Sequence, residues 1–100
     1  MNDDDSAIRA RHSALRLLAR REHSQYELRQ KLKVRGYGEG LVDNLLAELI
    51  TERLLSDTRY AEAMVTNRVS RGYGPLRIYM ELRDRGVAEP IVDKALQEAE

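Results

Sequence analysis

The residue types that could carry catalysis are few and poorly spaced. The only two histidines, His12 and His23, stand eleven residues apart, which matches no common metal-binding motif. We expect His12 to be half-buried on the apolar stripe of a helix and His23 to lie at a helix end. Acidic pairs such as Asp57 and Glu62 have no partner with an evident catalytic role. The chain also has no cysteine. The sequence therefore predicts no enzyme, no cofactor and no metal site.

Basic side chains offer binding chemistry instead. Residues 9–35 carry a net charge of +7 and residues 39–62 a net charge of −4, although the whole chain is neutral. Each half of the chain begins basic and ends acidic, which predicts a basic face and an acidic face. These charges can pair with one another across the fold, or they can bind a charged partner that has nucleic acid nearby. The sequence leaves both interpretations open.

The candidate partner contacts centre on one helix corner. In the segment RGYGP at 71–75, glycine follows a helix end and proline occupies the first position of the next helix. Tyr73 is expected to pack on its own helix end or to stack on a partner. The helix dipole alone could account for Arg68 and Arg71. The full set of candidate contacts is Arg68, Arg71, Tyr73, Arg77, Arg85, Arg20 and Arg21.

The elements that must position these side chains repeat with a period of fifty residues. Residues 11–50 and 61–100 are identical at 9 of 40 positions, against about two to three expected by chance. A fixed period of this length predicts stacked helical units. The first unit is expected to hold helices at 6–21, 25–35 and 40–54, and the second to begin its helices at 56 or 57, at 75 and near 90. No strand pattern alternates convincingly, so the predicted fold class is all-α, with tandem three-helix, helix-turn-helix-like repeats.

Capping residues support these boundaries. Ser24 and Glu27 form a capping box, in which each side chain accepts from a backbone N–H of the first turn. The expected apolar stripe of the first helix is Ile8, His12, Leu15, Leu18 and Ala19. The residues expected to cap or end helices are Ser24, Glu27, Gly36, Asp57, Gly72, Gly74, Pro75 and Gly86. The expected organisation is a disordered acidic N-terminus at 1–5, repeat 1 at 6–55 and repeat 2 at 56–100.

The ends and the apolar runs favour a cytoplasmic protein. The start DDD at 3–5 is the reverse of a signal peptide, and no apolar run approaches the roughly 20 residues of a membrane span. We therefore expect no membrane contact and a monomer.

Four linked segments resemble the RecX family, which regulates the bacterial recombinase RecA. They read LLARREHS at 17–24, ELRQKL at 27–32, LLSDTRYA at 54–61 and RGYGPLRIYMEL at 71–82. The resemblance covers nearly the whole chain, from 14 to 96. The family usually has three units and this chain holds two, so a third repeat is absent from the sequence.

The resemblance implies an elongated, curved helical protein that binds RecA or the RecA–DNA filament, with a possible weak direct DNA contact. Such binding would repress the recombinase, ATPase and coprotease activities of RecA, and with them homologous recombination, DNA repair and the SOS response. The alternative is a stand-alone helix-turn-helix DNA-binding module. A purely structural helical module is the third possibility.

Overall fold

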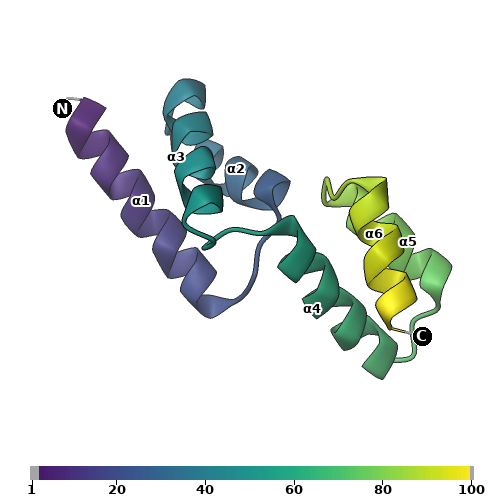
Figure 1. The fold of residues 1–100 in the computed structure, drawn as a ribbon. Helices are drawn as coiled ribbons and strands as arrows, with labels where there is room; N and C mark the ends of the chain where they lie inside the picture. Colours follow the sequence, from purple (N-terminus) through teal and green to yellow (C-terminus); the bar gives the residue numbers. More distant parts are fainter. Residues whose placement is uncertain (1–2, 100) are drawn as a thin grey trace.

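Six helices form two successive three-helix repeats (Figure 1). The computed structural model describes residues 3–99 of the chain. Repeat 1 holds α1 (Asp3–Arg20), α2 (Gln25–Val34) and α3 (Glu39–Thr51), and repeat 2 holds α4 (Asp57–Ser70), α5 (Pro75–Asp84) and α6 (Glu89–Glu98). Within residues 3–99 there is no strand, so the predicted all-α class is confirmed. The molecule measures 49 × 22 × 20 Å with a radius of gyration of 14.8 Å, against about 13 Å for a compact domain of this length. It is therefore elongated.

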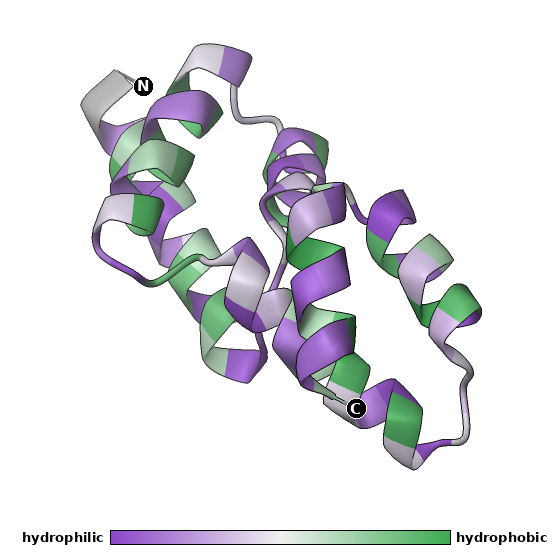
Figure 2. Ribbon diagram, turned by 45° about the vertical axis from the view of Figure 1, so that its right-hand side comes forward, coloured by the Kyte–Doolittle hydropathy of each residue, from purple (hydrophilic) through white to green (hydrophobic). Residues whose placement is uncertain are grey.

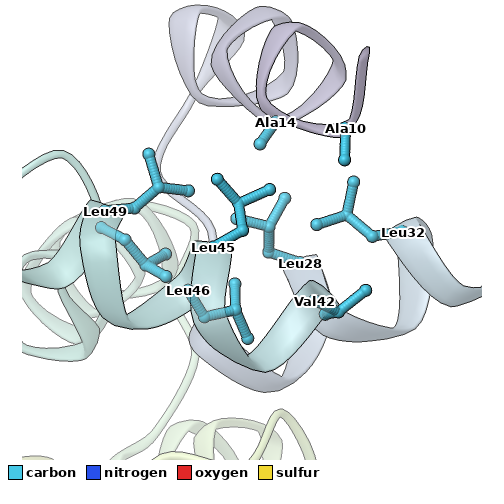
Figure 3. Close-up of a cluster of buried hydrophobic side chains, with 9 residues drawn as sticks. Ala10, Ala14, Leu28, Leu32, Val42, Leu45, Leu46 and Leu49 are labelled. Atoms are coloured by element: carbon cyan, nitrogen blue, oxygen red, sulfur yellow. The ribbon is translucent and has the colours of Figure 1, made fainter. Parts of the chain in front are cut away.

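Each repeat has a hydrophobic core of its own. The first core comprises Ala10, Ala14, Leu28, Leu32, Val42, Leu45, Leu46, Leu49 and Leu55. The second comprises Tyr60, Ala61, Met64, Val65, Ile78, Leu82, Val87, Val92 and Ala95. Figure 3 shows the two alanines of α1 pointing at the leucines of α2 and α3. Polar and apolar residues alternate along the helices (Figure 2), as expected where each helix buries one face. No buried apolar cluster joins the two cores.

The buried stripe of α1 differs from the expected one. Ala10 and Ala14 are fully buried, whereas His12 is exposed and Ile8 is 55% exposed. Small alanine side chains let α1 approach the leucines of α2 and α3 closely, which moves the larger side chains to the edge of the contact. The expectation that His12 is half-buried was therefore wrong.

Two helix boundaries also differ from the expected ones. α1 begins at Asp3 rather than at the expected residue 6. Residues 1 and 2 lie outside the described part of the chain. α3 ends at Thr51 rather than at 54. Arg53 adopts a left-handed φ of 62°, which closes the helix and lets Leu55 turn back into the first core.

The remaining caps follow the sequence, with one exception. The Ser24–Glu27 capping box is present, Gly74 precedes α5 and Pro75 begins it. Gly36, Gly72 and Gly86 all have positive φ, and the residue after each donates its N–H to a carbonyl five residues back, as in a Schellman motif. The exception is Asp57. Ser56 caps α4, because its hydroxyl accepts a hydrogen bond from the Arg59 N–H. The Asp57 carboxylate instead accepts a hydrogen bond from repeat 1.

Gly86 and Gly72 offer a matched pair of substitutions. A Cβ on Gly86 would lie 2.6 Å from the Cβ of Tyr26 in repeat 1, whereas a Cβ on Gly72 would meet nothing within 4 Å. Both have φ near +80°. We expect Gly72→Ala to cost about 1 kcal/mol through backbone strain, and Gly86→Ala to cost about 1–3 kcal/mol more through the clash. Urea unfolding of both variants measures the difference; equal losses would show that the two repeats do not meet at Gly86.

Candidate partner-binding surface

The two repeats meet through polar contacts between residues 21–27 and residues 57–60 and 85–86, which we call the junction. The Ser24 hydroxyl accepts from the Glu27 N–H of its own helix and donates to the Arg85 carbonyl at 2.8 Å. The Asp57 carboxylate accepts from the Gln25 N–H at 2.8 Å. Because Gln25 is the first residue of α2, Asp57 satisfies a backbone donor that the helix itself leaves unpaired. One repeat thus completes the cap of a helix in the other.

Glu27 is the charged centre of the junction. Its carboxylate accepts two hydrogen bonds from Arg21, at 3.0 and 2.7 Å, and one from Arg85 at 3.2 Å. Burial by itself would raise the pKa of Glu27, but the ion pair with Arg21 outweighs burial and holds the pKa below its ordinary value. A carboxylate with this many charged donors remains ionised although its side chain is only 10% exposed. Glu27 therefore joins Arg21 of repeat 1 to Arg85 of repeat 2.

The junction accounts for two of the candidate contact residues. Arg21 and Arg85 both bind Glu27, and Arg85 Nη1 also lies 3.4 Å from the Tyr60 hydroxyl. Arg59 adds an ion pair to Glu22 at 2.9 Å. The Arg85 guanidinium thus links repeat 2 to Glu27 of repeat 1, and the Arg21 guanidinium holds Glu27 within repeat 1. Neither group is free to meet a partner without breaking its ion pair.

His23 is fully enclosed at the same place, with a relative exposure of 1%. Lys31 Nζ lies 2.9 Å from His23 Nε2, and the Arg21 carbonyl lies 3.2 Å from Nδ1. An ammonium group can only donate, so Nε2 accepts and the ring proton is on Nδ1, where it donates to the carbonyl. Burial, followed by the charges of Arg21 and Lys31, lowers the pKa of His23 against the opposing effect of that carbonyl. The histidine, expected only at a helix end, is a neutral part of the junction.

Three arginines gather around Tyr73 at the turn from α4 to α5, and we call Arg68, Arg71, Tyr73 and Arg77 the arginine corner. The guanidinium carbons of Arg68, Arg71 and Arg77 lie 5.6, 5.8 and 3.7 Å, respectively, from the centroid of the Tyr73 ring. Such contacts stabilise a cation over an aromatic face. Tyr73 is half-buried against the second core, as expected for packing on its own helix end. Four of the seven candidate residues therefore come together.

The corner contains one bound arginine and two available ones. Arg68 binds Glu81 through Nε at 2.7 Å and so ties α4 to α5. Arg71 and Arg77 are exposed, and neither makes an ion pair among the side chains that the structure describes. Their guanidinium groups are held over the Tyr73 ring with their N–H edges open to a ligand.

Sequence reasoning missed the apolar side chains beside the corner. Leu76 is 71% exposed and Met80 58% exposed, and both line a shallow depression together with Arg77, Glu81 and Asp84. Their i, i+4 spacing on the face opposite the buried Ile78 and Leu82 was the signal that could have found them. We call Leu76 and Met80 the apolar strip.

Arg20 does not join the corner. It lies at the exposed end of α1 and lines a depression of its own with Arg53, Leu54 and Arg59. Elsewhere the basic and acidic helices pair with each other: Arg11 binds Glu52 at 2.9 Å, and Arg29 binds Asp43. Mutual pairing thus accounts for part of the charge pattern, which leaves fewer cations for a partner.

The described residues contain neither a metal-binding cluster nor a membrane-spanning helix. Among residues 3–99, no group of three or more histidine, aspartate or glutamate side chains is arranged to hold a metal ion. In the same part of the chain, none of the helices combines the length and the apolar character that crossing a bilayer requires.

The fold defines a tandem three-helix-repeat protein. Residues 10–49 match the model of the first three-helix domain of RecX, and residues 56–96 match the model of the second. Regulatory protein RecX from Halorhodospira halophila is 53% identical over 90% of this chain and 56% of its own length. Regulatory protein RecX from Pseudomonas putida is 44% identical over 96% of this chain and 68% of its own length. The chain belongs to the RecX family, a family of regulatory proteins that is not known as an enzyme family.

Two solved structures share the fold. The crystal structure of RecX from Lactobacillus salivarius superposes with a TM-score of 0.90 over 97% of this chain and 64% of that one, at 24% identity. A crystal structure of regulatory protein RecX gives 0.89 over 97% and 48%, at 26% identity. The chain spans about three fifths of the length of three of the RecX relatives that it matches.

Because His23 is buried at the junction, we expect the free energy of unfolding to vary with pH through this residue. The pKa of His23 is lowered in the folded state. Its contribution to the free energy of unfolding is therefore fully present above the unfolded-state pKa of about 6.5. That contribution is lost as the pH falls below this value, by up to about 1.4 kcal/mol per pH unit. The charges that face it are Lys31, Arg21 and Glu27. We expect His23→Gln to remove this part of the acid sensitivity in urea unfolding at pH 7.5 and 5.5.

His12→Gln is the matched control, because His12 is exposed on α1, and it should keep the pH dependence of the parent chain. If His23→Gln retained the same loss of stability between the two pH values, the buried neutral histidine would not be the sensitive group.

Proposed function

We propose that the chain binds RecA or the RecA–DNA filament and represses the recombinase, ATPase and coprotease activities of RecA. The observation that carries the proposal is the ordered match of both repeats to the first and second RecX domains. The family resemblance supplies RecA as the partner. Repression by binding requires no catalytic group. The proposed location is the cytoplasm.

The proposed contact surface is the arginine corner, with Arg20 as a second cation on repeat 1. The corner offers Arg71 and Arg77 unpaired, whereas Arg21 and Arg85 serve the junction. The 49 Å length of the molecule suits a protein that spans neighbouring subunits along a filament. A monomer held rigid by the junction would present the two cationic places at a fixed separation.

A stand-alone helix-turn-helix DNA-binding module is the second candidate, since α4, the tight turn and α5 have the required order. The exposed face of α5 argues against it. That face carries Leu76, Met80 and Asp84, whereas a helix in the major groove presents donors to bases and cations to phosphates. Tight duplex binding without RecA that weakens steeply with salt would favour this second candidate.

The proposal predicts suppression of RecA. Titrating the 100-residue chain into RecA on single-stranded DNA should lower the rate of ATP hydrolysis in a saturable, dose-dependent way, because a bound repressor occupies the filament. The control is a mock titration with buffer alone, at the same volumes and salt concentration. An unchanged rate with a chain shown to be folded by circular dichroism would contradict repression by these two repeats.

A further inference from the structure

Arg53 occupies a position at which three other helices of this fold have glycine. After the C-caps of α2, α4 and α5, the next residue is a glycine with positive φ: Gly36, Gly72 and Gly86. α3 ends in the same way, but its left-handed residue is Arg53, with a φ of 62°. The closing hydrogen bond is equivalent, since Leu54 donates its N–H to the Leu49 carbonyl at 2.9 Å. Because a side chain disfavours this conformation and glycine does not, glycine would end α3 at lower cost.

The Arg53 side chain lines the depression between the end of α1 and the connection from α3 to α4. We call this the mid-chain depression. Its exposed cations are Arg20 and Arg53, and its apolar residues are Leu15, Leu18 and Leu54. Strained backbone positions are typical of functional sites, where the side chain does something that a less strained residue could not. The strained residue and the depression therefore point to the same place on the molecule.

Two of the four arginines that line the depression have no carboxylate partner. Arg59 is paired with Glu22, and Arg21 with a carboxylate of the junction. Arg20 and Arg53 make no ion pair with any side chain that the structure describes. Since Glu22 is already neutralised by Arg59, the depression carries two uncompensated positive charges. These charges favour an anionic ligand.

The apolar residues of the depression indicate which kind of anion fits it. Leu54 is 41% exposed, and Leu15 and Leu18 are half-buried against the first core. Apolar side chains with arginines beside them are typical of protein–protein interfaces, in which arginine is enriched. A guanidinium group can hold a carboxylate through two parallel hydrogen bonds. An acidic residue next to an apolar residue would satisfy both parts of the depression.

A nucleic acid strand fits the depression less well. None of the described residues that line it is aromatic, so bases would have no ring on which to stack. A phosphodiester backbone could use the two arginines, but it would leave Leu54 without an apolar contact. The observations therefore favour a protein.

The mid-chain depression does not coincide with the surfaces on which successive repeats stack. By the fifty-residue shift, a unit stacked before repeat 1 would contact 7–10 and 35–36, the equivalents of 57–60 and 85–86. A unit stacked after repeat 2 would contact 71–77, the equivalent of the part of repeat 1 that repeat 2 covers. None of the residues at 7–10, 35–36 or 71–77 lines the depression. Stacking of further units in this way would leave it open.

We propose that the mid-chain depression binds an acidic segment of the partner protein, with a carboxylate on Arg20 and Arg53 and an apolar side chain on the leucines. The inference rests on the proposed function for the identity of that partner as RecA. It goes further in adding Arg53 and Leu54 to the contact surface and in assigning the chemistry of the segment that they bind. The cost of the left-handed Arg53 is then offset by its contact with the partner.

The first experiment compares thermal unfolding and RecA binding for two substitutions at position 53. Arg53→Gly should raise Tm by about 3 °C, because relief of the left-handed strain exceeds the added freedom of the unfolded chain. The same substitution should weaken RecA binding by about 10-fold. Arg53→Lys keeps both the charge and the strain, so we expect Tm within about 1 °C of the parent and binding weakened by only about 3-fold. A folded Arg53→Gly variant that melts at or below the parent's Tm would show that the arginine serves the fold, which would overturn the inference.

The rest of the depression is tested in the same binding measurement. Arg20→Ala should weaken RecA binding by about 10-fold and Leu54→Ser by about 5-fold. Arg35→Ala is the matched control, since Arg35 is exposed at the C-cap of α2, and it should stay within about 2-fold. If Arg20→Ala and Arg53→Gly both bound RecA as this control does, the depression would not be part of the interface. Suppression of RecA by the parent chain would then leave the proposed function intact.

The second experiment needs no RecA, so its outcome is separate from that of the proposed function. The probe is an acetylated and amidated Glu-Leu-Glu peptide, titrated into the chain and followed by methyl NMR. We expect saturable shifts at the Leu18 and Leu54 methyl groups that Arg53→Gly removes. A Glu-Ser-Glu peptide should give smaller shifts and a Lys-Leu-Lys peptide none. An equal response in the Arg53→Gly variant, or no response at these methyl groups, would overturn the inference.

Two further outcomes would assign the depression to another occupant and so overturn the inference as well. Oligothymidylate that shifts the same methyl groups at lower concentration than the acidic peptide would identify a nucleic-acid site. A parent chain that sediments as a dimer, with an Arg53→Gly variant that sediments as a monomer, would identify a second copy of the chain as the occupant.

Discussion

The separation of the apolar residues into two cores is the constraint on which the rest of the molecule depends. Since no buried apolar cluster within residues 3–99 spans the repeats, their relative position rests on hydrogen bonds and ion pairs at the junction. Ser24 and Glu27 serve twice, first as the capping box of α2 and then as partners of repeat 2. Local helix formation and long-range assembly therefore use the same two side chains, so α2 cannot lose its cap without loosening the junction.

Because Glu27 has both roles, some arginines are committed to structural ion pairs and others are not. Burying Glu27 requires cations close by, and Arg21 and Arg85 meet that need. Arg68 is likewise held by Glu81. Some cations have no carboxylate partner among the described side chains, although Glu81 and Asp84 line the same depression as Arg77. Arg71 and Arg77 are the clearest case, because an aromatic ring orients them and no carboxylate neutralises them.

The features that could be predicted from the sequence are those that depend on residues close to one another along the chain. The capping box and the glycines that end helices depend on contacts within a few positions, and both are present in the structure. The fifty-residue period can be found by comparing the sequence with itself. The roles of Asp57 and Arg85 depend on partners 32 and 61 residues away, so no local pattern reports them. The stripe of α1 was misjudged for a related reason. Which face is buried was decided by how closely alanines let neighbouring helices approach, and a count of large apolar residues does not contain that information.

The two equivalent turns show how one fold can start the second helix of a repeat in two different ways. In repeat 1 a side chain caps α2, and the box requires Glu27 to turn back toward Ser24. In repeat 2 proline starts α5 with a fixed φ and without an N–H that needs a partner. No side chain at position 77 is then needed for the cap. Position 77 can change from an inward-turned acid to an outward-facing arginine while the helix still begins at the same place. The proline start thus permits the charge reversal at position 77 without loss of the helix start.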